Sequence, residues 1–280
     1  MPDAPLHHAN DVMIRPIESE AECQACIRLQ HEIWGEDFGD VVPVSILRIA
    51  QRLGGVTAGA FDEQDRLLGF VFGMTGLIDG RLAHWSDMLA VSPAARDLGI
   101  GRRLKLHQRD ALRALGISTM YWTYDPLVAR NAFLNLVRLG ARPAEYVVNF
   151  YGAETGSPLH DVTGTDRFIV AWDLSRDAAG AHADDRDAKA NSIEEPFVVN
   201  PAGEDGRPRL LDLPADSEVR IEIPRDITTL MERDVDSAQA WRATTRRAFT
   251  HYLKHGYRVA GFSAGPESGR CFYILRSTEA

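Results

Sequence analysis

The sequence has few of the features that mark exported or membrane proteins. Its 280 residues include three cysteines, too few for a disulfide framework in a chain of this length. The opening residues, MPDAPLHHANDV, have neither a basic start nor an apolar centre, so we expect a loose terminus and not a secretory signal. No apolar run has the length of a bilayer-spanning helix. These absences predict a protein of the reducing cytoplasm with no membrane partner.

An excess of positive charge is also missing. The chain carries 40 acidic and 31 basic residues, a net charge of −9, and its pI is near 5.5. This balance argues against nucleic acid as a partner, because the phosphate backbone binds through clustered Lys and Arg. Any polyanionic ligand therefore needs a local basic patch. The length allows one large domain or two ordinary ones.

Two of the cysteines, Cys23 and Cys26, form a C-x-x-C pair that a redox centre or half of a metal site would also show. No second pair and no His-x-x-x-His follows at the spacing of a zinc site. Both cysteines fall close to one apolar helical stripe with Ile27 and Ile33. We therefore expect helix packing for them and no metal site.

Residues 12–174 are predicted to form strands that alternate with helices. The predicted strands cover 12–18, 56–62, 66–76, 83–91, 119–125, 144–152 and 166–174, and the predicted helices cover 19–35, 42–55, 99–116 and 130–140. Ser19 and Glu22 have the spacing of a capping box at the start of the first helix. The pattern predicts an α/β layer fold (α+β) with a mixed sheet.

A change of composition separates a second part of the chain. Residues 175–192 are rich in Ala and Asp without an apolar period, which indicates a linker or mobile loop over about 175–195. Beyond it we expect a smaller C-terminal α/β lobe, 196–280. Its predicted strands cover 196–199, 208–213, 219–224, 256–262 and 270–276, and its helical region, 226–255, has one face formed by Ala238, Trp241, Thr245, Ala248 and Tyr252.

The stretch RDLGIG, 96–101, joins a strand to a helix, where exposed backbone N–H groups could hold a phosphate. A Walker loop needs Gly-Lys-Ser/Thr at its end, and a dinucleotide fingerprint needs a third glycine where Leu104 stands. The stretch instead resembles [Q/R]-x-x-G-x-[G/A], the pyrophosphate-binding motif of the GNAT acyltransferase superfamily. The surrounding DMLAVSPAARDLGIGRRL resembles that family's strand–turn–helix core, and the element order of 12–174 resembles the family's order.

The resemblance implies a GNAT domain over 12–174 with a mixed, mostly antiparallel sheet flanked by helices. It implies acetyl-CoA or another acyl-CoA as co-substrate, and no metal. Glycines let the backbone approach a pyrophosphate, and the helix start offers N–H groups and a positive dipole end. Arg103 and Lys105 add positive charge or form the solvated face of the helix. The residues implied to bind the cofactor are Leu89 and Val91 along the pantetheine arm, Arg96, Leu98, Gly99, Ile100, Gly101 and Arg102 at the pyrophosphate, and Asn131, which is alternatively a helix-start residue.

For catalysis, the resemblance implies that an amine attacks the thioester and that a base on the strand before the turn removes a proton. His84 and Asp87 lie on that strand, and Asp87 alternates with Leu89 and Val91, which favours Asp87. The family's general acid is usually a tyrosine in a Y-x-x-x-G-F-like ending, but this chain has Leu136–Ala141 there. Tyr124 and Tyr151 are the alternatives, or water protonates the thiolate.

The expected function is transfer of an acetyl or succinyl group from acyl-CoA to a small amine or amino acid. The stretch YWTYDPLVARNAFLNLVRLGA also resembles a little-characterised bacterial branch of the superfamily. A non-catalytic acyl-CoA-binding protein and a protein-lysine acetyltransferase remain alternatives. In the last lobe, the ending Tyr252–Tyr257 resembles the missing motif, so residues 196–280 are either a degenerate half-copy of the fold or a lid or dimerisation extension, which leaves a homodimer open.

Overall fold

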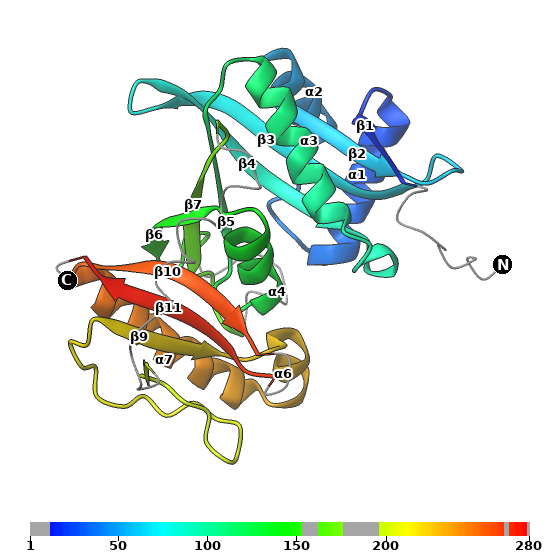
Figure 1. Cartoon of the computed structure of the whole chain (residues 1–280). Helices are drawn as coiled ribbons and strands as arrows, with labels where there is room; N and C mark the ends of the chain where they lie inside the picture. Colours follow the sequence, from blue (N-terminus) through cyan, green and yellow to red (C-terminus); the bar gives the residue numbers. More distant parts are fainter. Residues whose placement is uncertain (1–11, 153–161, 176–195, 266–268, 279–280) are drawn as a thin grey trace. The chain divides into compact units, whose positions relative to one another are not determined.

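The computed structural model describes residues 12–152, 162–175, 196–265 and 269–278 (Figure 1). The predicted loose N-terminus, up to residue 11, and the predicted linker from residue 176 lie outside the described residues. Contacts divide the chain into two compact units: residues 1–122 with 173–175, and residues 123–172 with 176–280. The division falls within strand β5 (Thr119–Tyr124) and not at the composition change near residue 175.

The first unit is built on a mixed sheet. Its strands lie in the order β1-β2-β3-β4-β5, with antiparallel pairs up to β4 and a parallel pair between β4 and β5. This confirms the mixed, mostly antiparallel sheet that the sequence predicts. The elements of this unit are β1 (Met13–Pro16), α1 (Glu20–Trp34), α2 (Val44–Arg52), β2 (Val56–Phe61), β3 (Leu67–Ile78), β4 (Arg81–Val91), α3 (Ile100–Ala114) and the first residues of β5.

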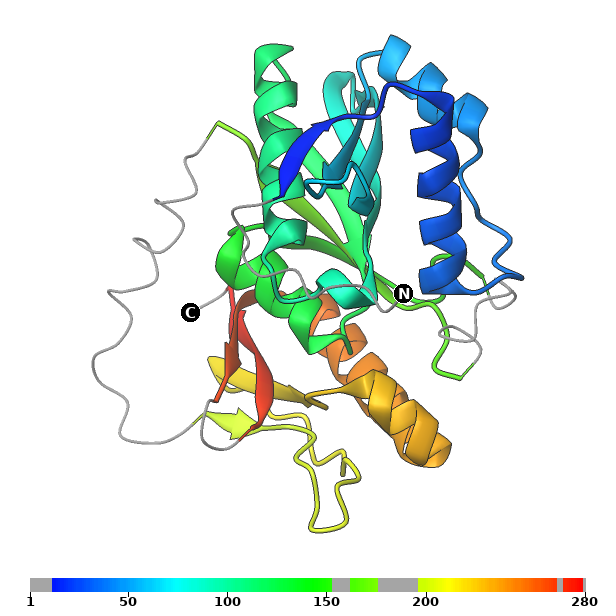
Figure 2. The same cartoon turned by 90° about the vertical axis from the view of Figure 1, so that its right-hand side faces the viewer.

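Helices flank this sheet, with α1 and α3 on opposite sides of it (Figure 2). The core between the sheet and α1 and α2 contains Cys23 and Cys26, together with Phe70, Phe72 and Met88 of the strands. Both cysteines are fully buried, and burial raises the pKa of Cys26 to about 12. A thiol with so high a pKa is inert at neutral pH, which supports the packing interpretation of the C-x-x-C pair.

The start of α1 follows the predicted capping box. Ser19 Oγ accepts a hydrogen bond from the Glu22 amide at 3.2 Å, and the Glu22 carboxylate accepts one from the Ser19 amide at 3.1 Å. The two side chains satisfy N–H groups that have no partner within the helix.

The second unit contains a strand pair, a four-stranded sheet and their helices. β6 (Arg142–Val147) pairs antiparallel with β7 (Arg167–Asp173). The other sheet has the order β10-β11-β9-β8, in which β8 and β9 are parallel and the remaining pairs antiparallel. The further elements of this unit are α4 (Ala129–Ala132), a π-helix (Phe133–Arg138), β8 (Phe197–Val198), β9 (Glu218–Ile223), α6 (Ile227–Arg233), α7 (Val235–Lys254), β10 (Tyr257–Ala264) and β11 (Cys271–Ser277).

Three predictions for this unit need correction. The strand expected at 208–213 is an irregular segment with a single bridge between Ala202 and Pro208, because its amides bond to nearby loop carbonyls and not to a ladder. The helix expected at 130–140 changes to a π-helix at Phe133. The helical region 226–255 is two helices, because the Asp234 side chain accepts from the Ser237 amide at 3.0 Å and begins α7.

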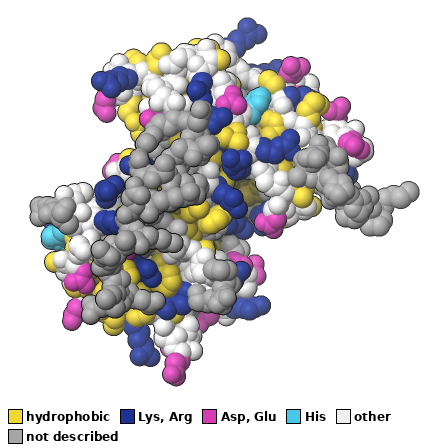
Figure 3. Space-filling model, in the orientation of Figure 1, with side chains coloured by type: hydrophobic (Ala, Val, Ile, Leu, Met, Phe, Trp, Pro, Cys, Tyr) yellow, Lys and Arg dark blue, Asp and Glu magenta, His cyan; other side chains and the backbone are white. Residues whose placement is uncertain are grey.

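The predicted apolar face of α7 is confirmed. Ala238, Trp241, Thr245, Ala248 and Tyr252 are all buried, and α7 packs on β9 and β10. On the face of the molecule in Figure 3, basic side chains are interspersed with acidic and apolar ones. Among the residues that the structure describes, no helix has the length and apolar character needed to cross a membrane.

Candidate functional site

The turn before α3 has the geometry of an anion-binding loop. Gly99 has φ +71°, a left-handed conformation that favours glycine, and α3 begins directly after it. The helix start has no side-chain cap and no acidic residue in its first turn. A Cβ at Gly99 would meet no atom within 4 Å, so the space above the turn is open. The positive end of the helix dipole is therefore accessible to an anion.

The predicted basic residues around the turn differ in their surroundings. Arg96 and Arg102 are exposed, while Arg103 donates a hydrogen bond to the Val12 carbonyl at 2.5 Å. Lys105 is almost completely buried, so its prediction as part of a solvated face is wrong. Its Nζ lies 4.0 Å from the centre of the Trp122 ring, and a long apolar stem allows that burial. Arg96 and Arg102 thus supply the exposed positive charge at the turn.

Strand β4 contains a bulge at Asp87. Met88 pairs with Phe72 and Ser86 pairs with Gly73, which leaves Asp87 as an extra residue on β4. The two sides of the bulge face opposite layers: Met88 belongs to the core under α1 and α2, whereas Ser86 bonds to α3. Bulges re-aim side chains and are frequent next to active sites. Simple alternation along β4 therefore does not hold across Asp87.

The Asp87 side chain is half-buried at this bulge. Burial raises its pKa, and the negative charge of Asp40, in the loop between α1 and α2, raises it further. A raised pKa brings a carboxylate closer to neutral pH, where a general base works best. The position combines a re-aimed strand residue with a perturbed carboxyl group, a combination typical of functional sites.

A buried chain of hydrogen bonds holds the strand next to the bulge. Lys105 Nζ donates to Ser86 Oγ at 2.7 Å, and Ser86 Oγ donates to Gln108 Oε1 at 2.8 Å. Ser86, Lys105 and Gln108 are all buried. The chain anchors β4 to α3, the helix that begins at the glycine turn. Burial holds the pKa of Lys105 well below its ordinary value, which favours a neutral amine.

The same chain continues through His84, the other titratable residue predicted on this strand. Gln108 Nε2 lies 2.9 Å from His84 Nε2, and His84 Nδ1 lies 3.0 Å from Thr75 Oγ1, which donates to the Gly54 carbonyl at 2.7 Å. These partners assign the proton to Nδ1. Burial, with a smaller effect of Lys105, lowers the pKa of His84 to about 3. His84 is thus a buried neutral residue that helps to position β4.

Gly73, opposite the bulge, was not predicted as a site residue. A Cβ there would contact the His84 ring and would lie 2.6 Å from the Trp85 carbonyl oxygen. The bulge therefore requires glycine on the neighbouring strand. The sequence signal is a glycine within an apolar strand, which indicates close backbone approach.

β4 and β5 pair over a short distance only. The parallel ladder consists of His84 with Met120 and Trp85 with Tyr121. Leu89 and Val91, the residues predicted to contact a pantetheine arm, pair with β3 on their other side. In the described part of β5 no ladder partner faces them, so their backbone edge is available to another extended group. Along the chain, this edge leads to Leu98, Ile100 and Gly101 at the turn, of which Ile100 is buried and the others half-buried.

The remaining predicted residues lie in the second unit. Asn131 is half-buried in α4, and its amide donates to the Val128 carbonyl at 2.9 Å. Tyr124 is buried, accepts a hydrogen bond from Tyr273 Oη at 3.3 Å, and has a pKa raised by burial. Tyr151 is partly exposed, with its hydroxyl 2.9 Å from Thr123 Oγ1.

Comparisons with known proteins find likeness at the level of structure. No family model and no curated protein sequence matches the chain. The ribosomal-protein-S18-alanine N-acetyltransferase of Escherichia coli is similar with a TM-score of 0.44 and 19% identity over 59% of this chain and 96% of its own. The yncA protein of Salmonella typhimurium, solved with its cofactor acetyl-CoA, has a TM-score of 0.46 and 19% identity over 59% of this chain and 95% of its own.

A third similar structure, an aminoglycoside 6'-N-acetyltransferase complexed with coenzyme A, has a TM-score of 0.43 and 15% identity over 58% of this chain and 97% of its own. Each of these matches covers somewhat more than half of this chain and nearly all of the other.

Proposed function

We propose that the chain is a GNAT-type N-acyltransferase that moves an acetyl or related acyl group from acyl-CoA to an amine. The observation that supports this most strongly is the continuity of one surface in the first unit. An unpaired edge of β4 at Leu89 and Val91 follows a bulged carboxylate and precedes an uncapped helix start at Gly99. In acyl-CoA the thioester, the pantetheine arm and the pyrophosphate follow one another in this order. Attack on the thioester needs a base, the arm needs a free strand edge, and the pyrophosphate needs an uncapped helix start.

In this proposal the pyrophosphate lies on the turn. Amides of Gly99, Ile100 and Gly101 donate to its oxygens, and the side chains of Arg96 and Arg102 add charge-assisted contacts. Leu98 and Ile100 shape the turn, and the arm extends along Leu89 and Val91 as an added strand does. The local positive charge explains how an acidic protein could bind a polyanion.

The proposed reaction needs one base and one oxyanion donor. Asp87 accepts a proton from the substrate ammonium, directly or through water, and the neutral amine attacks the thioester carbonyl. A backbone N–H of β4 near Leu89 stabilises the oxyanion, the C–S bond breaks, and CoA leaves as a thiolate. The attacking nitrogen loses its second proton, which passes through water to that thiolate. Of the two tyrosines predicted as general acids, both in the second unit, Tyr151 is partly exposed, whereas the hydroxyl of Tyr124 is bonded within an aromatic core.

The proposed acceptor is a small amine or amino acid. The second candidate function, acyl-CoA binding without catalysis, is favoured by Leu136 at the position where the family motif has tyrosine. The variant Asp87→Asn distinguishes the two candidate functions. An enzyme should lose turnover with this variant and keep its affinity for CoA, whereas a binding protein has no turnover to lose.

The experiment begins with calorimetric titration of acetyl-CoA, succinyl-CoA and free CoA into the full chain. The preferred donor is then offered to a panel of amino acids and simple amines, with released thiol measured by its reaction with a chromogenic disulfide. We expect one CoA per chain and thiol release that depends on an amine. Absence of binding by all three CoA compounds would refute the proposal.

For residues 196–280 we also propose a degenerate half-copy of the GNAT fold. Strand β9, helix α7 and the hairpin β10–β11 follow one another as β5, α4 with its π-helix, and β6–β7 do, and each series begins with a parallel strand pair. Between β8 and β9, where the first series has the glycine turn and α3 between β4 and β5, residues 199–217 are all described and contain no helix. Tyr252 of the motif-like ending donates to the Pro214 carbonyl at 3.0 Å. A stoichiometry of two CoA molecules per chain would contradict this proposal.

A further inference from the structure

Exposed apolar side chains of the first unit gather at one end of it. Helix α2, the C-terminal end of α3 and the hairpin between β3 and β4 all lie at this end, which is uppermost in both views (Figure 1, Figure 2). Single exposed apolar residues are ordinary, but a group of them on one surface indicates a binding site. Six large apolar residues of these segments are 38–71% exposed and are called the apolar patch: Ile46, Ile49, Leu53, Leu77, Leu82 and Leu115.

Printed contacts bring the three segments of the apolar patch together. Leu77 and Leu82 face each other across the hairpin as a ladder pair. Two residues before Leu77, on the same face of β3, Thr75 Oγ1 donates to the Gly54 carbonyl at 2.7 Å. A Cβ at Gly54 would lie 3.7 Å from Leu115 Cδ1. The leucines of the apolar patch therefore lie together around Gly54: Leu53, Leu77, Leu82 and Leu115.

Helix α2 extends the apolar patch along one of its sides. Ile46 and Ile49 precede Leu53 at the spacing i, i+3 and i+7, so the three side chains line one side of the helix. A different side of α2, with Leu47 and Ala50, packs in the core. The helix is thus apolar on two sides, although the core covers only one of them.

Basic side chains accompany the apolar patch. The exposed arginines of the same segments are Arg48, Arg52, Arg81 and Arg113. Two exposed acidic side chains lie near them, Asp79 at the hairpin turn and Glu18 beside the arginines of α2. Arg109 and Asp110 pair with each other at 2.8 Å and cancel. Four basic and two acidic side chains leave a local excess of positive charge, in a chain whose net charge is −9.

We propose that the apolar patch is a docking surface for an anionic lipid bilayer. Its leucines and isoleucines enter the boundary between headgroups and acyl chains, and the arginines contact the negative groups of the lipids. Arginine suits this place, because its apolar stem lies along the apolar surface while its guanidinium stays in water. A helix with exposed basic and apolar sides is typical of a membrane surface. Acidic residues elsewhere in the chain matter less, since the attraction falls off within a Debye length.

Two other occupants fit the apolar patch less well. A second copy would present the same surface, so the excess of positive charge would meet itself across an isologous contact. A protein partner is recognised by shape complementarity in a closely packed interface. The four leucines instead stand out from the ends of three segments, each more than half exposed. Insertion into a bilayer needs only that they protrude together.

Docking through the apolar patch leaves the proposed CoA surface open. The patch includes Leu115, at the C-terminal end of α3, whereas the turn at Gly99 precedes the first residue of that helix. The 15 residues of α3 correspond to a length of roughly 22 Å. Lipid binding can therefore be measured without CoA or an acceptor, and it stands or falls independently of the proposed acyl transfer.

The first measurement is sedimentation of the full chain with lipid vesicles at fixed ionic strength. Vesicles of phosphatidylcholine alone are compared with vesicles that also contain phosphatidylserine. The chain should bind the anionic vesicles about 10-fold or more tightly than the neutral ones, the effect of two uncompensated basic residues near a charged surface. Higher salt should reduce this difference.

Leucine variants test the apolar contribution. Leu53→Ser combined with Leu77→Ser should weaken binding to anionic vesicles by roughly 10-fold or more, because both changes remove apolar surface that the lipid would cover. The control combines Leu211→Ser with Val235→Ser, two residues of the second unit that are each 43% exposed. The control should bind as the wild type does. All four positions are on the surface, so thermal unfolding should give similar midpoints.

Arginine variants test the contribution of charge. Arg52→Gln combined with Arg81→Gln should weaken binding to anionic vesicles by roughly 10-fold or more and leave binding to neutral vesicles nearly unchanged. The variant keeps every residue of the apolar patch, so it separates the effect of charge from that of apolar surface.

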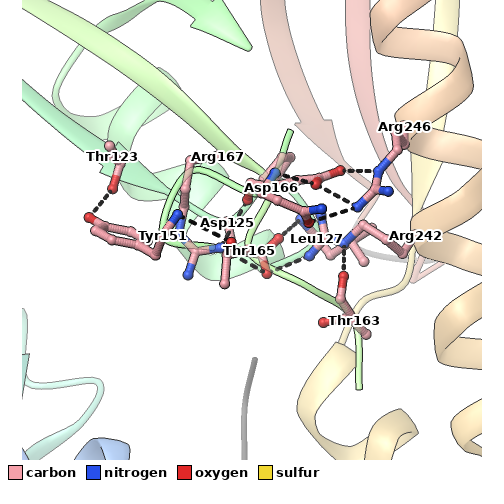
Figure 4. Close-up of polar contacts among 12 residues, drawn as sticks. Thr123, Asp125, Leu127, Tyr151, Thr163, Thr165, Asp166, Arg167, Arg242 and Arg246 are labelled. Carbon is pink, nitrogen blue, oxygen red and sulfur yellow. Dashed lines mark hydrogen bonds and ion pairs between the residues drawn. The ribbon is translucent and has the colours of Figure 1, made fainter. Parts of the chain in front are cut away.

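The control for charge has to avoid the paired arginines of the second unit. Figure 4 shows that Arg242 and Arg246, on α7, are bonded to aspartates, so their loss would disturb the fold. Arg247→Gln combined with Arg258→Gln changes two exposed arginines of that unit and removes the same charge. This control should bind anionic vesicles as the wild type does.

Three outcomes would overturn the docking surface: no binding to anionic vesicles, equal binding to both kinds of vesicle, or binding that the leucine variant leaves unchanged. Sedimentation velocity without lipid tests the second copy. A wild-type dimer that the leucine variant dissociates would assign the apolar patch to self-association instead. A chain that binds vesicles but transfers no acyl group would refute the proposed function alone.

Discussion

The glycine turn can be tested with two glycines of the same helix. Gly99 precedes α3 with φ +71°, and Gly116 follows it with φ +75°. A Cβ at either position would meet no atom within 4 Å. Alanine should therefore cause the same conformational penalty in both places, about 1–2 kcal/mol for a left-handed L-residue. That penalty lowers the unfolding midpoint by roughly 2–8 °C in a chain of two such units.

The two variants should differ in ligand binding. If the turn holds a pyrophosphate, the methyl group of Gly99→Ala occupies the space from which the anion approaches, whereas Gly116→Ala leaves that space open. Loss of one or two amide–phosphate hydrogen bonds at about 1.5–3 kcal/mol each weakens CoA binding by roughly 10-fold or more.

The assay is calorimetric titration of CoA into both variants and the wild type, with thermal unfolding of the same samples. Similar losses of stability with a selective loss of affinity in Gly99→Ala would support the pyrophosphate site. If both folded variants bind CoA as tightly as the wild type, the turn only starts a helix and the reasoning from its geometry is wrong.

Further predictions concern β4 and its buried neighbours. Asp87→Asn should lower turnover by about 10²-fold or more with unchanged CoA affinity. Asp40→Asn should move the acidic limb of the pH–rate profile to lower pH, because it removes a charge that raises the pKa of Asp87. If kinetic assays show that this limb does not move, Asp87 is not the base. Lys105→Met should flatten the rise of unfolding free energy as the pH approaches the ordinary pKa of lysine from below. The wild type gains stability there because burial lowers the pKa of Lys105 in the folded chain, so that the unfolded chain binds more protons. Denaturant unfolding at several pH values, with the exposed Lys254→Met as control, would show the change, and identical slopes would contradict it. His84 should remain neutral at pH 5, because its pKa is lowered to about 3; imidazole nitrogen NMR checks this, and a protonated ring at that pH would be the contrary result.

Local sequence signals predicted much of the first unit. The capping box at Ser19, the glycine turn at Gly99 and the order of elements all depend on short-range preferences and periodicity. The bulge at Asp87 was not predicted, because a bulge is visible only in the register between two strands. The burial of Lys105 was missed for a related reason. Its position next to Leu104 lies on the buried face of α3, but a hydrophobic pattern counts lysine as polar.

For the charged cluster of the second unit, formed by Asp125, Asp166, Arg167, Arg242 and Arg246, sequence patterns also fail to predict the contacts, here between residues far apart in the chain. The apolar face of α7 was predicted correctly, and Arg242 lies on that face one turn after Ala238. Its partner Asp125, however, stands 117 positions earlier in the chain. No periodicity within a helix can indicate such a pair. Its buried charge therefore becomes apparent only when tertiary contacts are known.

The bulge on β4 also bears on how this protein can change during evolution. Ser86 pairs with Gly73 and Met88 pairs with Phe72, so deletion of Asp87 would leave both pairs on their present faces and make the pairing with β3 regular. Only the extra residue, and the bend that re-aims it, would be lost. Descendants that lose a base at this position can therefore keep the fold with a gap as well as with a substitution, so that a strand one residue shorter would mark an inactive lineage.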